Sequence, residues 1–243
     1  MITDAFSSGP IIIAHRGACA VAPENTCSAI EKAIEMGVKV IEFDVRETSD
    51  GVLVLFHDKD LRRLLDRKDS IETLTWNEAK ELDVGGWFGK EEFEGEKPMS
   101  LKGAIQLCVE HEVTPLIEHK TGAAINYATV LERLDVVDQV IVQSFSWTFL
   151  SEIRRELPEL KIGALGKRTL DRSKLGQLAE LKPDWVGWNF KDLTTTGLKT
   201  LKREGFLVAL WTVNDPKVVN QWIERGVDGI ITDHPDKMLK LLD

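Results

Sequence analysis

Short apolar runs alternate with amphipathic segments along most of the 243 residues of this chain. The apolar runs, each of strand length, are Ile11–Ala14, Val38–Ile41, Val52–Phe56, Thr114–Ile117, Val140–Gln143, Lys161–Leu165, Asp184–Trp188, Phe206–Thr212 and Gly229–Thr232. The amphipathic segments include Glu24–Met36, Ser146–Glu156, Ser173–Leu181, Thr195–Glu204 and Pro216–Gly226. Strands that alternate with helices form parallel sheets, and their buried strands have continuous apolar sequences. The pattern predicts an α/β protein.

One junction departs from this alternation. The strands Val40–Arg46 and Val52–Phe56 are separated only by the turn at 48–51, which is too short for a crossover helix. These two strands must therefore be antiparallel. Without this hairpin arm, eight parallel strands remain, which predicts a closed (β/α)8 TIM barrel; a doubly wound open sheet is the alternative.

The hairpin also decides which side chains face each other. If the turn centres on Ser49–Asp50, Asp44 lies opposite Leu55 and Glu42 lies opposite His57. We therefore expect His57 beside the two carboxylates.

The chain length suits a single barrel domain over residues 1–243. Residues 59–99 interrupt the pattern with a polar stretch that contains a capping box at Thr75–Glu78. This insertion is expected either to cover the barrel mouth as a small cap subdomain or to be a packed excursion without a role.

Composition excludes several function classes. The net charge of −9 argues against binding to nucleic acid or an anionic membrane. Cys19, Cys27 and Cys108 lack zinc-like spacing, which indicates reduced thiols in a cytoplasmic protein. Met1–Pro10 lacks the features of a signal peptide, and no apolar run is long enough to span a bilayer. We expect a soluble, cytoplasmic protein; a homodimer is an open alternative to a monomer.

Three carboxylates at strand ends suggest a metal site. Glu42 and Asp44 are two residues apart on one strand, so their side chains point to the same face, and Glu118 ends another strand. Oxygen-only ligands favour Mg²⁺ or Ca²⁺ over zinc. An isolated pair of acids would instead fit an edge strand that faces water.

Two histidines and two cations also lie at strand ends. His15 and His57 suit general acid–base catalysis, whereas a lone histidine there would more often be a hydrogen-bonded core residue. Arg16 and Lys120 could bind a phosphate or form ion pairs with neighbouring acids, and the two roles are compatible. Trp211 could line the substrate pocket, although core packing is the default for an aromatic residue in such a run.

Through these residues the chain resembles the glycerophosphodiester phosphodiesterases, in their bacterial cytoplasmic form. The matching motifs are Ala14–Gly17, Pro23–Thr26, Ile41–Val45, Asp50–Gly51, His57–Asp58, Ile117–Lys120, Trp211–Asn214 and Asp228–Asp233. The resemblance implies a phospholipase-C-like barrel with a cap. It makes His15 and His57 the acid–base pair, Glu42, Asp44 and Glu118 the ligands of one divalent cation, and Arg16 and Lys120 phosphate contacts. Glu24 would lie near the substrate.

The implied reaction is hydrolysis of a glycerophosphodiester, such as glycerophosphocholine or glycerophosphoethanolamine, to sn-glycerol 3-phosphate and an alcohol. One rival is a lysophospholipase D or sphingomyelinase D-like enzyme on the same barrel. A rival from another class is a non-catalytic phosphodiester-binding protein. Attack by water and attack by the glycerol 2-hydroxyl through a cyclic phosphate both remain open.

Overall fold

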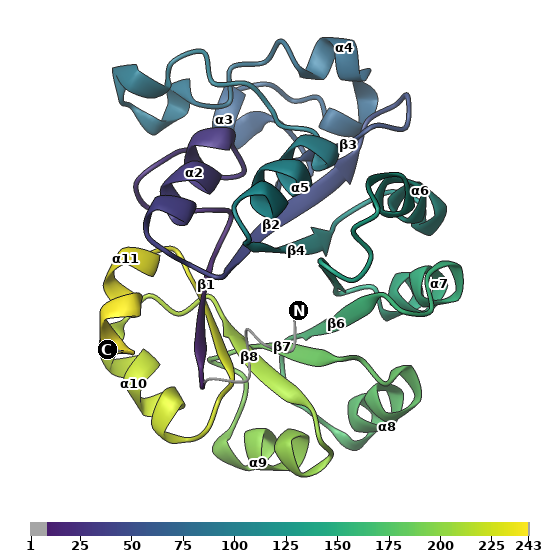
Figure 1. Cartoon of the computed structure of the whole chain (residues 1–243), viewed down its shortest axis with the longest axis vertical. Coiled ribbons are helices and arrows are strands. Elements are labelled where there is room, and N and C mark those ends of the chain that lie inside the picture. The colour runs from purple at the N-terminus through teal and green to yellow at the C-terminus, as the bar shows by residue number, and fades with distance from the viewer. Residues whose placement is uncertain (1–8, 243) are drawn as a thin grey trace.

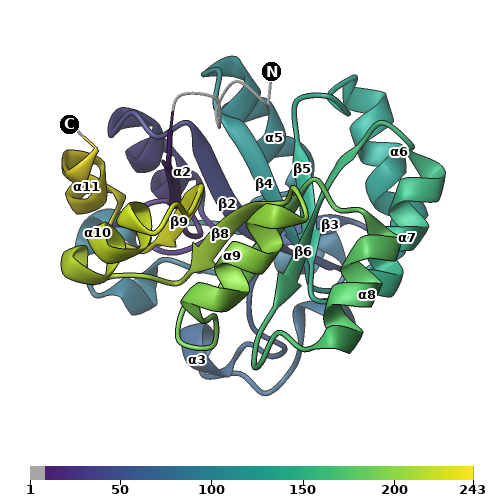
Figure 2. The same cartoon turned by 90° about the horizontal axis from the view of Figure 1, so that it is seen from below.

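The computed structural model describes residues 9–242, and in that part of the chain nine strands form one sheet that closes into a barrel (Figures 1 and 2). The strands are β1 (Ile11–Ala14), β2 (Val40–Glu47), β3 (Leu53–Leu55), β4 (Thr114–His119), β5 (Ile141–Ser144), β6 (Lys161–Gly166), β7 (Trp185–Asn189), β8 (Leu207–Trp211) and β9 (Gly229–Thr232). All except β3 pair in parallel, and β1 pairs with both β2 and β9. The eight-stranded barrel is confirmed, and its closure rules out the open sheet.

Helices surround the barrel and cover the outer face of its strands (Figure 2). The longer ones are α2 (Cys27–Glu35), α5 (Leu101–Glu110), α6 (Ala124–Leu134), α7 (Trp147–Glu156), α8 (Arg172–Leu181), α9 (Thr195–Arg203) and α10 (Pro216–Glu224), and the short α11 (Pro235–Met238) follows β9. The main hydrophobic core lies between strands and helices. A smaller cluster, which includes Ile13, Leu116 and Trp185, fills the barrel interior. This packing directs the polar residues at the strand ends towards the barrel mouth.

The hairpin arm is antiparallel as predicted, but its predicted register is wrong by one residue. Val45 lies opposite Leu55, so Asp44 is not the partner of Leu55, and Glu42 is not opposite His57. The Thr48 amide donates to the carbonyl of Val52, which leaves three loop residues instead of two. Gly51 closes this loop at φ +83°, a left-handed conformation that glycine adopts without steric cost.

The segment 59–99 forms short helical turns beside the hairpin arm, at the top of Figure 1. These turns are α3 (Arg62–Leu65), η1 (Ile71–Thr73), α4 (Trp76–Ala79), η2 (Gly86–Phe88) and η3 (Glu91–Phe93). The predicted capping box is present, since Thr75 caps α4 and Glu78 bonds back to it. Apolar residues such as Leu61, Ile71 and Leu82 pack with Phe56 into a separate small core. The segment is thus anchored to the chain directly before His57.

Among the described helices, none has the length and apolarity needed to cross a membrane. The prediction that Met1–Pro10 is not a signal peptide concerns a segment of which residues 1–8 lie outside the described residues.

Candidate active site

Most of the predicted site residues line one cavity of about 130 Å³ at the barrel mouth. Its lining residues are His15, Arg16, Glu42, His57, Glu118, Lys120, Gln143, Phe145, Leu165, Trp211, Thr212 and Ile231. Its charged residues and histidines lie on β2 and β4 or within two residues after β1, β3 and β4. The aromatic and aliphatic residues come from the β5, β6, β8 and β9 side. One wall is therefore charged and the opposite wall is largely apolar.

The three predicted carboxylates form a compact cluster. Oxygen atoms of Glu42, Asp44 and Glu118 all lie within 4.8 Å of one another, and the three residues are buried. Asp44 and Glu118 are register partners on β2 and β4. Burial raises the pKa of Glu42 well above its usual range, and repulsion from Asp44 and Glu118 raises it further. Burial and the Asp44 carboxylate likewise raise the pKa of Glu118 to about 7.

Arg16 and Lys120 both contact these acids. Asp44 lies 3.0 Å from Nε of Arg16 and 2.9 Å from Nζ of Lys120, and Lys120 also contacts Glu118. The side-chain amide of Asn25 donates to Asp44 at 3.0 Å. Burial alone would raise the pKa of Asp44, but Lys120 and Arg16 outweigh it and hold that pKa well below the usual range. Both cations form ion pairs with the acids and also line the cavity.

The cluster fits a hard divalent cation. Oε1 of Glu42 is buried and has no hydrogen-bond partner among the described residues. A buried carboxylate oxygen without a partner is costly, and a bound cation would remove that cost. The donor set consists of oxygen atoms alone, as Mg²⁺ and Ca²⁺ prefer.

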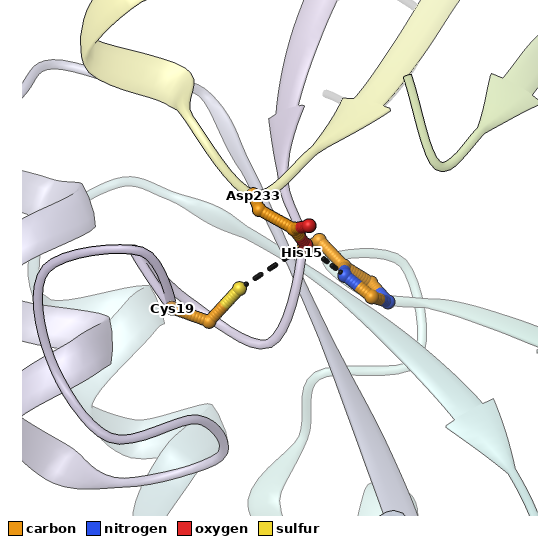
Figure 3. Close-up of side chains that lie close together, drawn as sticks. All are labelled: His15, Cys19 and Asp233. Carbon is orange, nitrogen blue, oxygen red and sulfur yellow. Dashed lines mark hydrogen bonds and ion pairs between the residues drawn. The ribbon is translucent and has the colours of Figure 1, made fainter. Parts of the chain in front are cut away.

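His15 is held by a residue from the far end of the chain. Its Nδ1 lies 2.6 Å from Oδ1 of Asp233, which directly follows β9 (Figure 3). Burial disfavours the Asp233 charge, but hydrogen bonds from His15 and Asn214 outweigh it and hold the pKa of Asp233 well below its usual range. An ionised carboxylate only accepts, so Nδ1 of His15 carries a proton and the other ring nitrogen remains for chemistry.

His57 has an equivalent arrangement. Its Nδ1 lies 2.7 Å from Oδ1 of Asp58, and Nε of Arg63 donates to the other oxygen of Asp58 at 2.6 Å. Burial lowers the pKa of His57 more than the nearby Asp44 raises it. The neutral imidazole, which can accept a proton, is therefore favoured.

Glu24 lies outside the cavity that the two histidines line. It accepts from Nη1 of Arg16 at 2.8 Å and from both terminal nitrogens of Arg63. Glu24 thus contacts the two arginines and lines a second, open cavity that also borders His15. Its geometry indicates that it orients Arg16.

Two polar atoms on the mainly apolar wall are buried without a partner among the described residues: Oε1 of Gln143 and Nε1 of Trp211. Trp211 lines the cavity, and its role in binding a substrate stays a prediction.

Sequence reasoning did not predict the roles of four residues of this site. Asp233 and Asp58 belong to motifs that it recognised, but their role as histidine partners requires the folded geometry. Arg63 lies in the insertion, within the basic run at 62–67, and Gln143 lies at the end of a predicted strand. A polar residue at the end of an apolar strand run was the signal for Gln143.

A family model described as "Glycerophosphoryl diester phosphodiesterase family" matches residues 15–237. The chain belongs to this family. It is 31% identical to the glycerophosphodiester phosphodiesterase of Caldanaerobacter subterraneus over 243 residues, which cover 96% of this chain and 97% of that protein. The match to the family begins at His15 and extends past Asp233, so it spans both residues of the His15–Asp233 pair.

Solved structures of glycerophosphodiester phosphodiesterases share the fold. A phosphodiesterase of Oleispira antarctica in complex with the product sn-glycerol-3-phosphate has a TM-score of 0.87 and 26% identity, over 98% of this chain and 99% of that one. An Agrobacterium tumefaciens glycerophosphodiester phosphodiesterase has a TM-score of 0.82 and 27% identity, over 95% and 99%. The predicted family and its barrel type are both confirmed.

Proposed function

We propose that this chain hydrolyses glycerophosphodiesters, such as glycerophosphocholine or glycerophosphoethanolamine, to sn-glycerol 3-phosphate and an alcohol. The observation that carries this proposal is one cavity in which two carboxylate-paired histidines face a cluster of three carboxylates. Family membership and the product complex of the Oleispira enzyme support it.

Glu42, Asp44 and Glu118 would hold one divalent cation, Mg²⁺ or Ca²⁺. When bound, the cation would neutralise charge on the phosphate as negative charge builds up in the transition state. It would also relieve the repulsion among the three buried carboxylates. Without the cation, their negative charge is balanced by the ion pairs with Lys120 and Arg16.

His15 and His57 would carry out the two proton transfers. One imidazole accepts the proton of the nucleophile, and the other donates a proton to the departing alkoxide of the alcohol. Asp233 and Asp58 fix the ring orientations through Nδ1, so each ring presents its other nitrogen to the substrate. General acid–base catalysis of this kind contributes about 10²–10⁴-fold.

Arg16 and Lys120 would bind the phosphate. They line the cavity from the side of the carboxylates, and each already contacts Asp44. Arg16 is fixed by Glu24 and can offer its remaining N–H groups to phosphate oxygens.

The remaining wall suits the glycerol part of the substrate. Phe145, Leu165 and Trp211 offer apolar contact, and Oε1 of Gln143 could accept a hydrogen bond from a glycerol hydroxyl while Nε1 of Trp211 donates one.

We also propose that residues 1–243 form a single domain in which 59–99 acts as a cap. The contacts of Arg63 with Asp58 and Glu24 support this role, because they connect the insertion to both sides of the site.

The test combines a coupled assay for released glycerol 3-phosphate, run with several glycerophosphodiesters, with an assay for released choline, run with glycerophosphocholine and with lysophosphatidylcholine. Mg²⁺, Ca²⁺ or a chelator is added to parallel reactions. We expect turnover of glycerophosphocholine or glycerophosphoethanolamine that the chelator abolishes. Faster turnover of lysophosphatidylcholine would favour the lysophospholipase D alternative, and binding without turnover would favour a non-catalytic protein.

A further inference from the structure

A second cluster of metal-binding side chains lies beside His15, outside the cluster of three carboxylates. The side chains of His15, Cys19 and Asp233 lie close together (Figure 3). They line an open cavity of about 530 Å³. Their ligand atoms, one nitrogen, one sulfur and one oxygen, all lie within 4.8 Å of one another.

The spacing of these atoms is close to that of a tetrahedral zinc site. Bonds of about 2.0–2.3 Å to the metal place neighbouring ligands about 3.3–3.8 Å apart. Sγ of Cys19 is 3.2 Å from Oδ1 of Asp233, so this pair needs almost no movement. Nδ1 of His15 is 2.6 Å from the same oxygen and would have to move by about 1 Å.

The backbone and a neighbouring amide hold the cluster in place. The Ala20 amide donates to the carbonyl of Asp233 at 3.3 Å and fixes the loop that carries Cys19. Nδ2 of Asn214 donates to the second oxygen of Asp233 at 2.5 Å and leaves Oδ1 for a ligand. These contacts are the kind of outer support that metal sites use to orient their ligands.

We infer that His15, Cys19 and Asp233 form a second metal site, selective for Zn²⁺ or Cd²⁺, whose occupation inhibits the enzyme. Thiolate and imidazole ligands select such ions, whereas the oxygen-only cluster of Glu42, Asp44 and Glu118 favours Mg²⁺ or Ca²⁺. The three residues line the adjoining open cavity, so a bound ion would be within reach of solvent.

Binding would exchange protons in a balanced way. The Cys19 thiol releases one proton as its sulfur bonds to the metal. The Nδ1 proton of His15 moves to the other ring nitrogen as Nδ1 becomes a ligand. Burial, with Asp233 nearby, raises the pKa of the Cys19 thiol, so without metal the sulfur stays protonated and poorly reactive.

Inhibition follows from the same exchange, and this step rests on the proposed role of His15. With metal on Nδ1 and a proton on the other nitrogen, the ring has no free lone pair and cannot accept a proton. Asp233 would also bind the metal and would therefore no longer orient His15 through a hydrogen bond.

Metal binding is tested directly with Cd²⁺, in the presence of excess Mg²⁺, through the ultraviolet charge-transfer band of cadmium thiolate. We expect one equivalent to bind to the parent chain and to Cys27→Ser, the matched control on α2. The band should be lost in Cys19→Ser, which keeps a hydroxyl donor for Asp233. Asp233→Asn should weaken the affinity at least about tenfold.

Zn²⁺ inhibition is then measured in excess Mg²⁺, each variant relative to its own activity without zinc. We expect Cys19→Ser to need at least about tenfold more Zn²⁺ for half inhibition than the parent and Cys27→Ser. A band that survives in Cys19→Ser, or that Asp233→Asn leaves unchanged, would overturn the site. Equal zinc sensitivity of parent and Cys19→Ser would overturn the inhibitory role. The cadmium band requires no turnover, so it separates failure of this site from failure of the proposed reaction.

Discussion

Arg63 donates to both carboxylate oxygens of Glu24, from Nη1 at 2.8 Å and from Nη2 at 2.6 Å. Its Nε donates at the same time to Asp58, the partner of His57. One insertion side chain therefore connects the residue that fixes Arg16 with the residue that fixes His57. Planar guanidinium groups suit such two-sided recognition, and a lysine cannot reproduce it.

Replacing Arg63 by alanine should lower kcat by about 10-fold or more, since Asp58 and Glu24 lose their common donor. Arg63→Lys should restore only part of the activity. The matched control is Arg67→Ala, because Arg67 on the same basic run pairs with Asp69 near the surface. Steady-state kinetics with glycerophosphocholine provides the measurement. Equal losses in Arg63→Ala and Arg67→Ala would contradict a positioning role.

Asp233→Asn should reduce kcat by about 10²-fold or more, because the amide no longer holds the proton of His15 on Nδ1. Asp236→Asn, three residues further along the chain, is the control and should leave kcat unchanged. Thermal unfolding of each variant shows whether the barrel remains folded. A kcat of Asp233→Asn equal to that of the parent chain would show that Asp233 does not position His15 for catalysis.

Metal should stabilise the protein more at high pH than at low pH. The pKa of Glu118 is about 7 in the folded chain against an ordinary 4.5, and that of Glu42 is also raised. Between these values the folded state binds more protons than the unfolded state, so the free energy of unfolding falls as pH rises. A cation that binds the ionised carboxylates of the cluster stabilises the folded state and so offsets this loss of stability.

The measurement is the Tm with Mg²⁺ and with chelator, at about pH 5 and about pH 8. The gain from Mg²⁺ should be about 5 °C or more at the higher pH and much smaller at the lower one. Glu118→Gln should remove most of this difference. A gain that is the same at both pH values would count against the metal site.

Gln143→Leu should impair recognition of the glycerol hydroxyls. A site that binds a hydroxyl rejects analogues without it, because its own polar group is left unpaired. The ratio of kcat/KM for glycerophosphocholine to that for an analogue without one glycerol hydroxyl should fall about 10-fold in Gln143→Leu. The exposed Gln139→Leu serves as the control. An unchanged ratio would remove Gln143 from substrate recognition.

Much of this arrangement follows from local sequence patterns. The β9 strand Gly229–Thr232 agrees with its predicted bounds, and Glu42 and Asp44 share a face because side chains alternate along a strand. The hairpin register was not predictable from loop length alone, since it depended on the conformation of Gly51. Helix α6 was not among the predicted segments, and Ala123 gives it no side-chain cap.

The missed site residues share another cause. His15 and Asp233 are 218 residues apart in sequence, and no local pattern predicts a contact over that distance. Arg63 lies in an insertion whose helical turns are too short for periodicity to place their side chains. Only the closed barrel and the packed insertion bring these groups to the histidines.

Pairing of β1 with β9 joins the first described strand to the last. A chain still emerging from the ribosome would carry His15 long before Asp233, because 218 residues separate the two. The contact between them also has the greatest loop-closure cost of any pair in the site. Hydrolysis should therefore begin only when β1 and β9 have paired, so turnover would report on the closure of the barrel during refolding.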